Sequence, residues 1–163
     1  MGGRGHGRQR LTDMRLRLLA VGTRMPDWVR AGFEEYARRL PRGLALEIVA
    51  VAQGSGTGAR ADEGARLLAR IAPRDQVVAL DERGESWSSA QLVVQLQRWQ
   101  QQGGDVCLLV GGADGLAPAC LERAAQRWSL SPLTLPHMLV RILVAEQLYR
   151  AHTILSGHPY HRA

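Results

Sequence analysis

Short apolar runs that alternate with helical segments constrain the fold of this chain more than any other feature. The clearest run, residues 106–110, reads Val-Cys-Leu-Leu-Val and passes directly into glycines. A run that is apolar on both faces is typical of a strand buried in a parallel sheet. Strands are predicted at residues 14–21, 44–52, 76–81 and 105–110. Helices are predicted at residues 27–37, 61–71 and 139–151, between Ser88-Ser89 and Gly103-Gly104 and, briefly, after Pro118. Strands alternating with helices predict an α/β fold, a parallel sheet with helices on both faces.

The length of 163 residues fits a single domain. We expect residues 1–13, rich in glycine and arginine, to form a disordered N-terminal extension and residues 14–163 to form the domain. No apolar run approaches the ~20 residues of a membrane span, and residues 1–10 lack the apolar core of a signal peptide. Two cysteines make no disulfide framework. These features predict a soluble, cytoplasmic protein without a membrane partner.

The charge balance points to a polyanionic partner. All 21 basic residues are arginine, against 15 acidic residues, which gives a net charge of +6 and a pI near 10.5. Codon usage rich in G and C accounts for arginine in place of lysine, but it does not account for the net excess. A basic chain of this kind suggests nucleic acid. Arg4, Arg8 and Arg10 lie in the extension, so the domain itself is only moderately basic.

Three segments are candidates to lie at strand ends, at the sheet edge where open parallel sheets bind ligands. They are Leu80–Asp81, residues 111–115 and residues 131–136. The glycines of residues 111–115 allow a ligand to approach the backbone closely, although an ordinary tight turn has the same composition. Their spacing is not that of a dinucleotide fingerprint, and the chain has no P-loop motif.

Two prolines exclude helix or central strand for residues 131–136. Such a stiff segment exposes backbone amides and carbonyls, which either recognise an adenine edge or belong to a plain surface loop. The four tryptophans are expected in the core or at an interface rather than as platforms for base stacking; they are Trp28, Trp87, Trp99 and Trp128.

The C-terminal region is rich in basic and aromatic residues. The spacing of His152, His158 and His161 fits no zinc pattern, so we expect no metal site. The tail from residue 156 either reaches a functional site or frays. Arg141 and Arg150 lie near one face of the last helix and either clamp a phosphate or carboxylate or form surface ion pairs. The residues themselves thus indicate a basic α/β protein with a ligand pocket.

Six segments together resemble the ribosomal large-subunit pseudouridine N3-methyltransferases. They are residues 19–29 (LAVGTRMPDWV), 109–116 (LVGGADGL), 128–131 (WSLS), 133–137 (LTLPH), 139–151 (LVRILVAEQLYRA) and 158–162 (HPYHR). The resemblance runs in order from Met14 to Ala163. It implies a fold of the SPOUT class with a C-terminal trefoil knot, an exception to the rule that chains stay unknotted. It also implies a homodimer that uses S-adenosylmethionine to methylate N3 of pseudouridine 1915 in 23S rRNA on assembled ribosomes.

The resemblance assigns roles to two groups of residues. The cofactor-binding group is Leu80, Gly112, Ser131, Pro132, Leu133, Thr134, Leu135 and Pro136. In the catalytic group His161 is the candidate base for the N3 proton, because its ordinary pKa is about 6.5. Tyr160 and Arg162 would orient or stabilise the developing anion, and Arg150 would contact phosphate or base. In such dimers the tail of one subunit is a candidate to complete the pocket of the other.

Two departures from the resemblance bear on substrate binding. The loop of residues 53–60 is short and holds one basic residue, Arg60, where relatives hold several. Ala113–Asp114 replaces the usual Pro-Glu and keeps the charge. The alternatives are a methyltransferase for another RNA, such as tRNA, and a non-enzymatic RNA-binding or ribosome-assembly protein. A pocket for S-adenosylmethionine distinguishes the enzymes from the binding protein.

Overall fold

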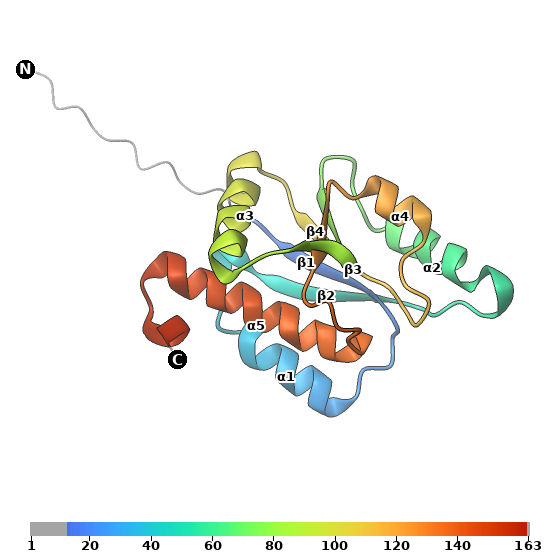
Figure 1. The fold of residues 1–163 in the computed structure, drawn as a ribbon, viewed down its shortest axis with the longest axis horizontal. Coiled ribbons are helices and arrows are strands. Elements are labelled where there is room, and N and C mark those ends of the chain that lie inside the picture. Colours follow the sequence, from blue (N-terminus) through green and yellow to red (C-terminus); the bar gives the residue numbers. More distant parts are fainter. Residues whose placement is uncertain (1–12, 163) are drawn as a thin grey trace, which may run out of the picture.

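The computed structural model describes residues 13–162, which form a five-stranded parallel sheet between two layers of helices (Figure 1). The strands follow the spatial order β2–β1–β4–β3–β5, and every neighbouring pair is parallel. Their bounds are β1 Leu16–Val21, β2 Leu46–Val51, β3 Gln76–Ser86, β4 Val106–Val110 and β5 Gln126–Ser129. The predicted parallel α/β sheet with helices on both faces is therefore confirmed. Residues 1–12 of the predicted extension lie outside the described residues.

Local sequence signals set several helix ends. The helices are α1 Asp27–Ala37, α2 Ala59–Leu68, α3 Ser89–Gln102, α4 Pro118–Arg123 and α5 His137–Ser156, with short 3-10 turns η1 Arg42–Leu44, η2 Gly56–Gly58 and η3 Pro159–Arg162. Ser88 and Gln91 form a capping box that starts α3. Pro118 opens α4, where its missing N–H is not needed. Gly157, in the left-handed conformation at φ 75°, ends α5.

Alternating residues of the strands build two cores. Leu18 and Ala20 of β1 belong to the core under α1, α3 and α5, while Leu19 and Val21 face the core under α2 and α4. This alternation is the period-2 pattern of a strand. The two buried cysteines, Cys107 and Cys120, lie in the second core. Burial, and then the neighbouring Asp75, raises the pKa of the Cys107 thiol to about 12, as expected for a small buried hydrophobe.

The third strand differs from its prediction. The predicted strand of residues 76–81 is too short, because β3 continues to Ser86 and includes Arg83 and Gly84. Leu80 and Glu85 both pair with Trp128 of β5, so the intervening residues 81–84 bulge out of the ladder. The bulge requires a close approach at Gly84, where a Cβ atom would lie 2.6 Å from the carbonyl carbon of Arg127. Glycine is thus needed at Gly84 for space rather than for its φ angle.

The other differences concern one strand and the ends of two helices. Strand β5 was not predicted, because Gln-Arg-Trp-Ser carries no apolar run. Helix α5 begins two residues before the predicted 139–151 and runs five residues beyond it, and α2 occupies 59–68 rather than 61–71. None of the helices between residues 13 and 162 is long and apolar enough to cross a membrane.

We expect Gly84→Ala to destabilise the fold by about 1–3 kcal/mol, because its methyl group would press on the backbone of β5. Gly58→Ala is the matched control: its φ is −93°, and the nearest neighbour of a Cβ there, Asp62 Oδ2, lies 3.9 Å away. The control should change the free energy of unfolding by no more than about 0.5 kcal/mol. Urea denaturation measures both variants, and equal stability of the two would contradict the close approach.

Candidate active site

A cavity of about 720 Å³ lies at the carboxyl edge of the sheet, beside the bulge of β3 and the ends of β4 and β5. Its size lies within the usual range for small-molecule sites. The three segments singled out in the sequence, residues 80–81, 111–115 and 131–136, all line it apart from Pro132. The lining extends from them to residues 80–83, 110–116 and 130–137. Of the residues predicted to bind a cofactor, the cavity is lined by Leu80, Gly112, Ser131, Leu133, Thr134, Leu135 and Pro136.

The glycine segment is both a tight turn and a wall of the cavity. Gly115 N–H donates to the carbonyl oxygen of Gly112 at 3.1 Å, and Gly115 has a φ of 77° that favours glycine. A Cβ at Gly111 would lie 2.5 Å from the carbonyl carbon of Gly115. The segment is therefore a tight turn, and the same turn presents bare backbone to the cavity.

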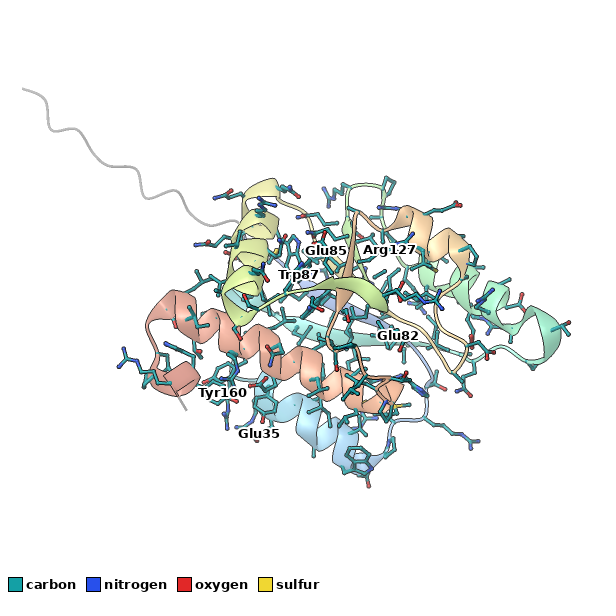
Figure 2. All side chains as sticks on the ribbon, in the orientation of Figure 1. Glu35, Glu82, Glu85, Trp87, Arg127 and Tyr160 are labelled. Carbon is teal, nitrogen blue, oxygen red and sulfur yellow. The ribbon has the colours of Figure 1, made fainter. Side chains whose placement is uncertain are left out.

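The loop of residues 131–136 is held by its own polar groups and by the bulge of β3. Ser129 Oγ donates to the carbonyl oxygen of Ser131 at 3.0 Å, and the Ser131 Oγ accepts from Leu133 N–H at 3.0 Å. Thr134 Oγ1 donates to Glu82 Oε2 at 2.9 Å, which links the loop to the bulge; Figure 2 labels Glu82. Leu133 is 71% exposed, so an apolar side chain stands uncovered at the rim.

The cavity combines an apolar floor with charged rims of both signs. Leu80, Trp128 and Leu135 supply apolar surface. The charged side chains of the lining are three carboxylates and two guanidinium groups, those of Asp81, Glu82, Asp114, Arg60 and Arg83. A site of this composition suits a ligand that has an apolar or aromatic part together with charges of both signs.

Arg141 proves to be a buried structural residue. Its side chain is 1% exposed, and its Nη2 donates to the carbonyl oxygens of Val21 and Gly22 at 3.1 and 2.8 Å. Burial lowers the pKa of this guanidinium, and its Nε has no partner among the described residues. The prediction that Arg141 forms a surface ion pair or a phosphate clamp is therefore wrong. It instead fastens α5 to the end of β1, next to Val140 in the cavity wall.

The C-terminal tail is folded against α5 rather than frayed. Tyr160 donates its hydroxyl hydrogen to Glu146 Oε1 at 3.1 Å, and its ring lies 4.7 Å from that of Tyr149. Arg150 donates from Nε and Nη2 to the same Glu146 oxygen at 3.0 and 2.6 Å. This ion pair is one of the two alternatives that the sequence left for Arg150. The hydrogen bond to Glu146 raises the pKa of the Arg150 guanidinium.

The tail does not reach the cavity of its own chain. Glu146 lies six residues after the last wall residue of α5, Val140, which is about 9 Å along a helix axis and about 240° around it. Tyr160, His161 and Arg162 are absent from the cavity lining, and Figure 2 shows Tyr160 far from Glu82. The structure thus keeps the predicted catalytic group apart from the predicted cofactor group.

The histidines of the tail show no metal arrangement. No group of three side chains able to hold a metal ion occurs in the part of the chain that the structure describes. His161 Nδ1 is buried and has no hydrogen-bond partner among those residues, whereas His158 Nδ1 accepts from the Tyr160 N–H at 3.2 Å. Burial lowers the pKa of His152, with a smaller contribution from His158.

Comparison with known proteins identifies the class. The family model described as "Predicted SPOUT methyltransferase" matches residues 14–161. Among solved structures, a probable methylase family protein from Haemophilus influenzae superposes with a TM-score of 0.55 at 13% identity, covering 92% of this chain and 70% of that one. A probable methyltransferase from Bordetella pertussis gives 0.50 at 17% identity, covering 86% and 95%. The chain is therefore a member of the SPOUT methyltransferases, and these solved structures share its fold.

Curated relatives narrow the class to a family. A protein from Chromohalobacter salexigens is 56% identical over 91% of this chain and 100% of its own length, and one from Nitrosococcus oceani is 52% identical over 92% and 99%. Both are named ribosomal RNA large subunit methyltransferase H. The chain belongs to the family of these methyltransferases, and the resemblance drawn from its sequence is confirmed.

We expect Tyr160 to ionise well above an ordinary tyrosine. Burial, followed by the Glu146 carboxylate, raises its pKa from 10.0 to about 12. Because the folded-state pKa is the higher one, the stabilisation of the docked tail is full below about pH 10 and is lost as the pH rises through about 12. The ultraviolet absorbance of tyrosinate, compared between wild type and Tyr160→Phe, isolates this group. The difference between the two titration curves should have its midpoint near pH 12. A midpoint near pH 10, the value for an unfolded chain in urea, would contradict the docked tail.

Proposed function

We propose that this protein transfers a methyl group from S-adenosylmethionine to N3 of pseudouridine 1915 of 23S rRNA in the assembled ribosome, acting as a homodimer in the cytoplasm. The observation that carries the proposal is the cavity. In a chain 56% identical to a ribosomal RNA large subunit methyltransferase H, the segments that the resemblance assigns to the methyl donor meet around one site. The net charge of +6 suits an RNA partner.

The residues present fit S-adenosylmethionine. The apolar floor at Leu80 and Leu135 suits an adenine ring, and the carboxylates of Asp81 and Asp114 suit its positive charges. The backbone around Gly112 is open to close approach. Bound there, the donor supplies a methyl group already activated on a sulfonium, so the protein chiefly has to align the reactants. The trefoil knot that the resemblance implies for the C-terminal region is part of this proposal.

The tail supplies the acid–base groups. The proton on N3 must leave, because a protonated imide nitrogen is a poor nucleophile, and His161 is the proposed base. The buried and unpartnered Nδ1 of His161 is consistent with an atom that gains a partner in the complex. Arg162, at the exposed end of η3, is proposed to stabilise the anion that forms on the ring. Tyr160 and Arg150, both bound to Glu146 of α5, are proposed to hold His161 and Arg162 in position.

The separation of tail and cavity within one chain supports a site shared between two subunits. A tail docked on α5 as far along as Glu146 does not line its own cavity. In a two-fold dimer, each subunit presents the same tail to the cavity of the other. We propose that the homodimer forms two such composite sites.

Methyl transfer itself is the first test. Purified protein, labelled S-adenosylmethionine and ribosomes that carry pseudouridine but lack the methyl group should yield label in the large-subunit rRNA. His161→Ala should lower the rate by about 10²–10⁴-fold, the usual contribution of a general base. His152→Ala, on α5 and outside the proposed site, is the control and should keep the rate near that of wild type. Label in tRNA would indicate another RNA target, and loss of both label and donor binding would leave an RNA-binding protein.

Complementation tests the shared site. Leu80→Arg places a long charged side chain on the apolar part of the cavity lining and should prevent S-adenosylmethionine from binding. His161→Ala should disable the tail. Subunits co-expressed in equal amounts should recover about a quarter of the wild-type activity, because half of the dimers then contain one site with an intact cavity and an intact tail. No recovery from mixed dimers that bind S-adenosylmethionine would contradict the composite site.

A further inference from the structure

Three side chains converge on the carboxylate of Glu146, in the middle of α5. Its Oε1 accepts from the Tyr160 hydroxyl at 3.1 Å and from Nε and Nη2 of Arg150 at 3.0 and 2.6 Å. Its Oε2 accepts from Gln147 Nε2 at 2.6 Å. The Glu146 side chain is 14% exposed, so these bonds are largely shielded from water. Charge-assisted hydrogen bonds in such surroundings are stronger than those between neutral groups.

The same residues hold the aromatic ring of Tyr160. The ring packs at 4.7 Å from that of Tyr149, and the Arg150 guanidinium carbon lies 5.2 Å from the ring centroid of Tyr160. A guanidinium at this distance is attracted to the face of a phenol ring. Tyr160 is thus fixed at its hydroxyl by Glu146 and at its ring by the two flanking side chains. Its backbone places the neighbouring His161 and Arg162.

Glu146 also limits what Arg150 can do. Nε and Nη2 of Arg150 both donate to Glu146, so the side-on pair of N–H groups is occupied. The second N–H of Nη2 and the two of Nη1 are not used in these bonds. Arg150 can therefore meet RNA only end-on, through Nη1 and Nη2.

The tail needs such an anchor because it is short and follows a helix end. Residues 157–162 leave α5 through the left-handed Gly157 and contain one turn of 3-10 helix. Segments of this kind are mobile unless a contact holds them. A base displaced by about 1 Å from its reactive position costs roughly 10²-fold in rate.

We propose that Glu146 is the positioning residue of the tail: it holds Tyr160 and Arg150 together so that His161 and Arg162 meet the methyl acceptor in one orientation. The role rests on the proposed function, since it assigns the tail to the acceptor side of the reaction. Glu146 itself does not line the cavity. It acts through the residues that it holds.

The test replaces the carboxylate with an amide of the same size. Glu146→Gln keeps an oxygen that can accept from Tyr160, but it removes the charge and brings donor against donor at Arg150. We expect kcat for ribosomal RNA to fall by about 10- to 100-fold. The Kd for S-adenosylmethionine should stay within about twofold, because the cavity does not include Glu146. Glu122→Gln, an exposed change of the same kind on α4, is the control and should leave kcat unaltered.

Two further readouts separate positioning from general stability. Amide hydrogen exchange in residues 158–162 should be faster in Glu146→Gln than in wild type, while exchange in the sheet stays the same. Tyr160→Phe, which removes only the hydroxyl, should lower kcat less. The double variant should be no slower than Glu146→Gln alone, because residues that act as one unit are not additive.

A wild-type kcat in folded Glu146→Gln would overturn the proposal, and so would a loss of kcat without any change in exchange of the tail. Additive effects of Glu146→Gln and Tyr160→Phe would also contradict a single unit. Exchange is measured without RNA, so its result stands even if wild type methylates no ribosome. Faster exchange of the tail combined with an inactive wild type would reject the proposed function alone.

Discussion

The buried guanidinium of Arg141 is the contact on which the functional geometry depends. It ties α5 to the last carbonyl groups of β1, and hydrogen bonds from a charged donor each contribute about 1.5–3 kcal/mol. Helix α5 carries the wall of the cavity at its start and the docked tail towards its end. Because one helix carries both, fixing its start against the sheet also fixes the position of the tail.

This arrangement explains how a small chain can provide both halves of a transfer site. The sheet edge supplies a cavity with a rigid glycine turn, and α5 directs the tail away from it. The tail folds back onto α5 at Glu146, about 9 Å along the helix axis from Val140 and on another side of the helix. The proposed composite site follows from this placement rather than from any unusual side chain.

The sequence was informative wherever local chemistry decides structure. The apolar run at residues 106–110 and the prolines of residues 131–136 predicted strand and loop correctly. It was uninformative where distant residues decide. Strand β5 is defined by its pairing with β3 and not by an apolar pattern of its own. The burial of Arg141 depends on its bond to a carbonyl group 120 residues away. The docking of the tail likewise depends on Glu146, which no local motif connects to Tyr160.

The bulge of β3 has a consequence for how such a site diversifies. Residues 81–84 lie outside the ladder of β3 and β5 while the pairs before and after them stay in place. Changes at Asp81 and Arg83 therefore alter the rim of the cavity without breaking hydrogen bonds of the sheet. Gly84, packed on the backbone of Arg127, and Glu82, which accepts from Thr134, are constrained. Evolution can thus vary ligand contacts at Asp81 and Arg83 while the scaffold is inherited unchanged.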